Sequence, residues 1–187
     1  MSSVKKLTLC AVCIALCVVL PPVFHMLALG SILSPMHIPV LLCGLACGWP
    51  YGAFCGLAGP LAAHLINGAP GAAMLVSMIP ELIVYGLVCG LLMKLIHTGK
   101  LYADLYSALI PAMLLGRIVG GIAQAIFLTS NGQSYSLALW AGAYLVKAVP
   151  GIILHLVLIP TLVVVLAQAR LIPARYPKSP AEESAAA

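Results

Sequence analysis

Between Lys6 and Glu81 the chain contains no formally charged side chain, so residues 7–80 are uncharged throughout. An α-helix crosses the hydrocarbon core of a membrane in about 20 apolar residues, so this stretch can supply three crossings. Over the whole chain, 63% of residues are hydrophobic and only 7% are charged. Soluble domains carry roughly a quarter charged residues, and disordered chains need low hydrophobicity. The sequence therefore predicts an integral membrane protein.

Clusters of proline and glycine divide the sequence into helices, because such clusters typically end them. In the uncharged stretch they lie at residues 21–35, 48–52 and 67–71. We expect helices near residues 5–28, 33–48, 52–66, 72–96, 104–128 and 137–169. The second and third are short for a full crossing and could instead form a re-entrant hairpin, which is tolerated only inside protein. The predicted fold is an all-α, compact bundle of six transmembrane helices over residues 1–172, with a disordered tail at 173–187.

Basic side chains concentrate on one side of this topology. They are Lys5, Lys6, Lys94, Lys100, Arg170, Arg175 and Lys178. By the positive-inside rule, both termini and residues 94–104 are cytoplasmic, and the loops at 21–35, 67–71 and 129–136 face outward. The N-terminal apolar run, followed by Ala28-Leu29-Gly30, loosely resembles a cleaved signal peptide. Because Pro21-Pro22 is unusual after such a run, we expect the first helix to be retained.

The seven cysteines predict packing rather than redox chemistry. Cys10-x-x-Cys13 has the spacing of a redox dithiol, but that spacing has meaning only near a βαβ pattern, which this sequence lacks. Their odd number and their absence from the outward loops argue against a disulfide framework. We expect them to behave as small hydrophobic residues. Glycines at four-residue spacing, such as Gly116 and Gly120, similarly favour close helix contacts.

Three charged residues, Glu81, Arg117 and Lys147, lie well inside predicted helices. A charge at the centre of a membrane costs roughly 2.5–3.5 kcal/mol, so such residues usually face a cavity or one another. Glu81 can form a salt bridge with only one of the two bases. The surplus positive charge would suit a carboxylate or phosphate on a ligand. The cluster of charges therefore predicts a polar cavity that binds an anionic molecule.

Helical spacing adds aromatic and polar neighbours to these charges, as at Trp140, Tyr144 and Lys147 on one helix face. Aromatic walls with a few placed polar groups are typical of small-molecule sites. The candidate substrate-binding residues are His37, Glu81, Tyr85, Arg117, Gln124, Asn131, Trp140, Tyr144 and Lys147. We expect Pro150-Gly151 to interrupt the helix beside them. His25, His64 and His155 show no metal-ligand spacing, and we predict no metal or cofactor.

Several motifs of enzymes and transporters are missing. The chain has no phosphate-binding glycine-rich loop that ends in Lys-Ser or Lys-Thr, so we expect it not to hydrolyse ATP. It also lacks His-Glu-x-x-His and Gly-x-Ser-x-Gly, and it shows no two-fold repeat of the kind that secondary transporters use. A binding subunit that takes energy from partners fits best. The alternatives are a membrane enzyme acting on a lipid headgroup and a stand-alone small carrier.

Four motifs follow one another in a distinctive order. They are Ala11-x-x-x-Ala15, the stretch SPMHIPVLL at 34–42, a glycine-rich segment at 43–60, and Pro80-Glu81-Leu82 with Tyr85-Gly86-Leu87. In this order, and with six short helices, residues 4–170 resemble the substrate-binding S component of energy-coupling factor (ECF) vitamin transporters.

The resemblance implies a high-affinity vitamin-binding subunit in the bacterial plasma membrane. Its ligand would lie in the outer half of helices four to six, covered by outward loops. Ala11 and Ala15 would dock on a transmembrane coupling protein that works with two cytoplasmic ATPases. Pantothenate would suit the surplus base, while riboflavin, a cobalamin-type corrinoid and a deazapurine base remain open.

Overall fold

The computed structural model describes residues 1–26, 35–133, 136, 142, 148–173 and 175–176. The elements in this part of the chain are all helical. They are α1 (Ser3–Met26), α3 (His37–Cys47), α4 (Trp49–Asn67), α5 (Ala72–Leu95), α6 (Leu101–Ser130) and α8 (Val149–Gln168). Of these, α1, α5, α6 and α8 are long and apolar enough to cross a membrane. The structure thus shows an all-helical chain with four candidate membrane spans.

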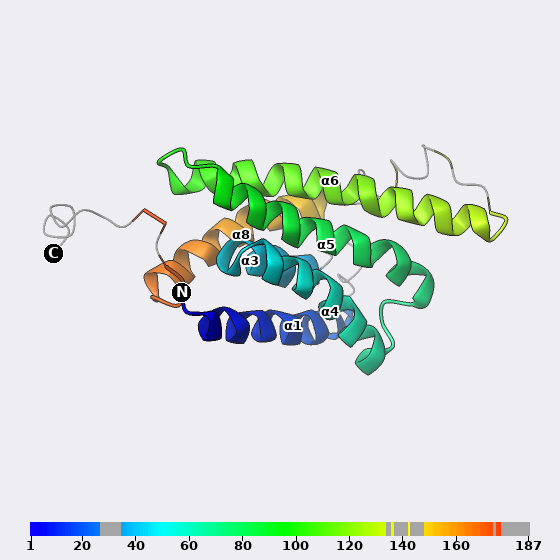
Figure 1. Cartoon of the computed structure of the whole chain (residues 1–187). Helices are drawn as coiled ribbons and strands as arrows, with labels where there is room; N and C mark the ends of the chain where they lie inside the picture. Colours follow the sequence, from blue (N-terminus) through cyan, green and yellow to red (C-terminus); the bar gives the residue numbers. More distant parts are fainter. Residues whose placement is uncertain (27–34, 134–135, 137–141, 143–147, 174, 177–187) are drawn as a thin grey trace, which may run out of the picture.

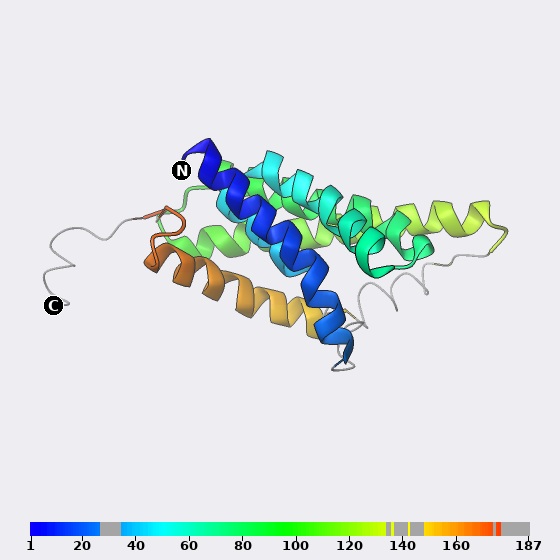
Figure 2. The same ribbon diagram turned by 90° about the horizontal axis from the view of Figure 1, so that it is seen from below.

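The helices pack along a common axis (Figure 1). α3 and α4 lie between α1 and α5, α6 packs along α5, and α8 packs against α3 and α6. Each helix runs opposite to the one before it. Figure 2 shows the first residues of α1 and the last residues of α8 at the same end of the molecule, which is also the end where α5 passes into α6 (Figure 1).

Pro21 and Pro22 do not end α1, which continues to Met26. A proline cannot donate a backbone hydrogen bond to the carbonyl four residues earlier, so Pro22 leaves the Val18 carbonyl without its usual helical donor. The side-chain amide of Asn67, at the end of α4, donates to that oxygen at 2.7 Å. The predicted outward loop at 21–35 therefore begins later, and a contact between two helices stabilises the proline-containing turn.

α3 is shorter than predicted, because it begins at His37 and has 11 residues. At 1.5 Å per residue its length is about 16 Å, roughly half of the hydrocarbon core. α4 begins at Trp49, with Pro50 in its first turn, so only Gly48 separates the two helices. The glycine has a positive φ of 97°, which a residue with a side chain rarely adopts.

α8 begins at Val149, whereas we predicted a helix from residue 137. Pro150 lies in its first turn, where a proline is tolerated because that N–H would have no helical partner. The expected interruption at Pro150-Gly151 is therefore the start of this helix. The earlier part of the predicted helix lies mostly outside the described residues.

Glycines allow unusually close contact between α3, α4 and α5. A Cβ added at Gly52 would lie 2.5 Å from the carbonyl oxygen of Gly86 and 2.6 Å from the Cα of Gly44. The three backbones meet at distances that no side chain could fit between. This is the close approach that small residues at four-residue spacing permit in membranes.

All seven cysteines are buried and free. Three of them, Cys10, Cys13 and Cys17, form the inward-facing stripe of α1. The thiols of Cys10 and Cys17 donate to the carbonyl oxygens of Tyr51 and Met36, at 3.6 Å and 3.8 Å. They pack as small side chains with a weak donor, as the sequence predicted.

A set of polar contacts joins the chain after α8 to the turn between α5 and α6. Arg175 donates to the carbonyls of Met93 and Ile96 at the end of α5. Its Nε lies 2.6 Å from the Asp104 carboxylate in the first turn of α6. The Tyr176 hydroxyl donates to the same carboxylate at 2.7 Å. Both residues lie within the predicted tail at 173–187, whose remaining residues are almost all outside the described part of the chain.

Candidate functional site

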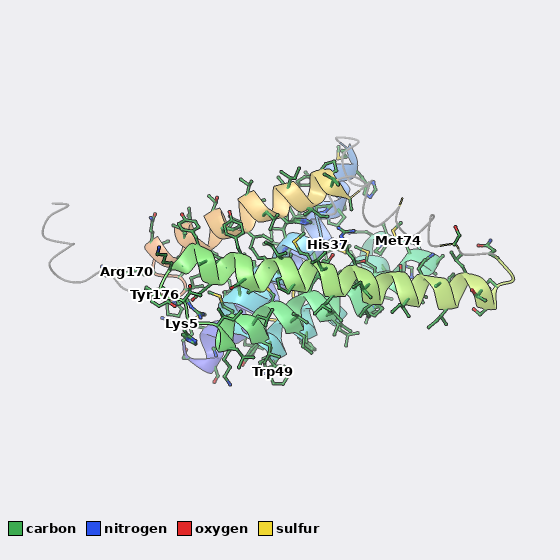
Figure 3. All side chains as sticks on the ribbon, turned by 90° about the horizontal axis from the view of Figure 1, so that it is seen from above. Lys5, His37, Trp49, Met74, Arg170 and Tyr176 are labelled. Atoms are coloured by element: carbon green, nitrogen blue, oxygen red, sulfur yellow. The ribbon has the colours of Figure 1, made fainter. Side chains whose placement is uncertain are left out.

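The interior of this apolar bundle contains polar side chains from four helices. His37 begins α3, Ser77 and Glu81 lie on α5, Arg117 lies on α6 and His155 lies on α8, and all five are buried. Figure 3 shows His37 within the bundle, away from the end that carries Lys5, Arg170 and Tyr176. Burial of polar groups at this depth is costly, so they usually have a partner or a function.

Glu81 is at the centre of the contacts among these residues. The hydroxyl of Tyr85, one turn along α5, donates to Glu81 Oε1 at 2.8 Å. The Nε2 atom of His37 lies 3.5 Å from the same oxygen, which makes an ion pair when the imidazole is protonated. α3 and α5 are therefore joined by polar side chains as well as by their glycines.

Aromatic contacts extend the cluster to α8. The His37 ring is tilted against the Tyr85 ring, with centroids 5.2 Å apart. On another side it stacks on the His155 ring at 5.6 Å, with only 23° between the planes. The four side chains His37, Glu81, Tyr85 and His155 form one connected set, which we call the polar cluster.

Glycines of α6 make room for the two members of the cluster on α5. A Cβ added at Gly120 would lie 2.9 Å from Glu81 Oε2, and one added at Gly116 would overlap the Tyr85 ring. The four-residue spacing of the two glycines matches the spacing of Glu81 and Tyr85. The glycine pair predicted to favour helix packing therefore also accommodates the polar pair.

The structure brings together three predicted site residues, His37, Glu81 and Tyr85. Among the described residues, the ion-pair partner of Glu81 is His37. A salt bridge from Glu81 to Lys147 stays a prediction, because Lys147 lies outside the described residues. Arg117 is buried on α6, next to Gly116.

The two remaining described candidates lie further along α6. The Gln124 side-chain oxygen is buried, with no hydrogen-bond partner among the described residues. Asn131 is exposed, and its amide donates to the Phe127 carbonyl at 2.8 Å, which caps the end of the helix. The predicted role of Gln124 in binding stays a prediction, whereas the Asn131 amide has a local structural role.

Trp140, Tyr144 and Lys147 lie outside the described residues, so their predicted role stays a prediction. The alanines of the predicted partner surface, Ala11 and Ala15, are exposed on α1, opposite its buried cysteines. Among the described residues, no group of three or more His, Cys, Asp or Glu side chains could hold a metal ion.

Sequence reasoning missed His155, because it tested the histidines only for metal-ligand spacing. A different signal was available. On α8 the buried residues recur at four-residue spacing, as Gly151, His155, Ile159 and Val163, and the histidine is the polar member of that stripe. A polar residue on the inward face of an apolar membrane helix is by default a functional candidate.

The comparison with protein families agrees with this geometry. Residues 5–163 match the family described as ECF transporter, substrate-specific component. Neither the search of curated proteins nor that of solved structures found a match. The match covers α1 to α6 and most of α8, and so includes every residue of the polar cluster. The chain is therefore a member of the ECF transporter substrate-specific components, multi-pass membrane proteins that bind the transported substrate.

Proposed function

We propose that this chain is the high-affinity binding subunit of an ATP-driven importer for a vitamin or related micronutrient with an anionic group, such as pantothenate. The observation that carries the proposal is the burial of Arg117 and the polar cluster inside an otherwise apolar bundle. Arg117 and Lys147 are two bases well inside the predicted helices against one acid there, Glu81, so the surplus of positive charge favours an anionic ligand. A charged side chain would bind such a ligand well, because hydrogen bonds between charged groups are stronger than those between neutral groups.

We further propose that the six helices make six membrane passes in a bacterial plasma membrane, with both termini cytoplasmic. Support comes from exposed basic residues at the end where α1 begins and α5 passes into α6, among them Lys5, Lys94 and Lys100. The positive-inside rule assigns such an end to the cytoplasm. In this orientation, residues 67–71 and the end of α6 face outward, toward the incoming substrate.

The partners in this proposal are a transmembrane coupling protein and two cytoplasmic ATPases. The exposure of Ala11 and Ala15 on α1 supports docking of the coupling protein there, because small residues let membrane helices approach closely. We expect Ala11→Leu with Ala15→Leu to abolish co-purification of the coupling protein while substrate binding persists. Loss of substrate binding in this double variant would contradict the assignment of α1 to the partner surface.

The ligand is best identified by native mass spectrometry of the detergent-purified protein. A stoichiometric, vitamin-sized molecule released from the protein would support the binding function and reveal the chemistry of the substrate. Bound lipid alone, with no stabilisation by a panel of vitamins, would favour an enzyme acting on lipid. Transport by the reconstituted chain without ATPase subunits would favour a stand-alone carrier.

The role of Lys147 has a separate test. We expect Lys147→Met to weaken binding of an anionic substrate by about 1.5–3 kcal/mol, the range for hydrogen bonds to charged groups. Isothermal titration with pantothenate, or with the molecule that mass spectrometry identifies, measures the change. Unchanged affinity would remove Lys147 from the site.

A further inference from the structure

His155 is a buried polar side chain in one of the most apolar helices of the chain. It is 0% exposed, and the other buried residues of α8 are Gly151, Ile159, Pro160 and Val163. Nothing in the local sequence of α8 requires a histidine, because a leucine or phenylalanine would fill the same volume at less cost in a membrane. The reason for an imidazole must therefore lie in what it meets across the bundle.

Across the bundle, the ring meets His37. The two imidazoles stack with centroids 5.6 Å apart, and the His37 Nε2 atom lies 3.5 Å from Glu81 Oε1. A stacked ring restricts rotation of its neighbour about χ2, which is a broad, soft torsion for histidine. Without it, the His37 ring could turn away from the carboxylate.

The contact connects α8 to the polar cluster. α8 packs against α3 and α6, and through the stacked rings it contacts His37 at the start of α3.

We propose that His155 is a positioning residue of the binding region. Its ring holds the His37 imidazole against the Glu81 carboxylate and thereby connects α8 to α3 and α5. The proposal rests on the proposed binding function, but its test uses ligand-free protein. A failure to find a vitamin ligand would therefore leave the result of this test unchanged.

The test is a ring-nitrogen NMR spectrum of protein labelled with ¹⁵N-histidine in detergent micelles. The five histidines are assigned by single substitutions to glutamine. In His155→Leu we expect the His37 ring resonances to shift, as the contact with Glu81 is lost. The matched control is Ile159→Ala, which opens a cavity one turn along the same buried face of α8 and leaves both rings in place. In this variant we expect the His37 resonances to stay where they are in the unchanged protein.

Two outcomes would overturn the proposal. The first is a His155→Leu spectrum in which His37 keeps its resonances. The second is an equal displacement in Ile159→Ala, which would make the effect one of general packing. If His155→Leu does not fold, His155→Met makes the same comparison, because the flexible thioether fills irregular gaps.

Discussion

The close approach of α3, α4 and α5 leads to a quantitative prediction for Gly52→Ala. The new Cβ would lie 2.5 Å from the Gly86 carbonyl oxygen and 2.6 Å from the Gly44 Cα. Both are backbone atoms, so no side-chain rotation can relieve the contact, and the helices must separate. Overpacking of this kind costs about 1–3 kcal/mol. Because both contacts are with backbone atoms, we take the upper end of this range; alanine regains up to about 1 kcal/mol over glycine as a helix former, so we expect a net loss of about 2 kcal/mol in the free energy of unfolding.

Reversible unfolding in mixed micelles, with increasing dodecyl sulfate and detection by far-UV circular dichroism, measures this loss. Gly71→Ala is the matched control, because a Cβ at Gly71 has nothing within 4 Å and its φ of −61° suits any residue. Gly71 is the N-cap of α5, where alanine is less favoured than glycine, so we expect the control to change the free energy of unfolding by no more than about 1 kcal/mol. A Gly52→Ala protein as stable as this control would refute the close packing of the three helices.

Two further predictions concern single polar contacts. Tyr85→Phe removes the hydroxyl that donates to Glu81 at 2.8 Å. We expect the free energy of unfolding to fall by about 1.5–3 kcal/mol in the same assay, as for other hydrogen bonds to charged groups. A change within experimental error would contradict the contact. Arg175→Gln removes the guanidinium that contacts Asp104 and the end of α5. We expect faster amide hydrogen exchange at residues 96–100, measured by mass spectrometry. Unchanged exchange at these residues would contradict a stabilising role of the Arg175 contacts.

The elements of the fold were largely predictable from the sequence. In a membrane every backbone polar group must be paired within the chain, so a long uncharged apolar stretch has to be helical. The ends of α5, predicted at 72 and 96, lie at Ala72 and Leu95. Prediction was poorer where a proline had two possible meanings. Pro22 lies within a helix because Asn67 takes up the carbonyl that the proline leaves free, and Pro150 begins a helix rather than interrupting one.

Three members of the polar cluster, His37, Glu81 and Tyr85, were among the predicted site residues, whereas His155 and the contacts within the cluster were not predicted. The buried face of α5 was correctly expected to contain Glu81 and Tyr85, since residues four apart share a helix face. A lysine or an arginine was considered as the partner of Glu81, and the structure adds His37, a histidine on another helix. Helical spacing says which residues share a face, while the rotation and depth of each helix decide which faces meet.

By itself, the sequence determined that this is a helical membrane protein with charged groups buried inside it. These properties follow from composition and from the local spacing of residues, because the interior of a membrane contains no water to pair with backbone or charged groups. Only the tertiary structure decided that His155 stacks on His37, that Gly116 and Gly120 accommodate the polar pair of α5, and that Arg175 reaches Asp104. Each of these contacts joins residues far apart in the chain. They depend on how closely the helices approach, which no local pattern specifies.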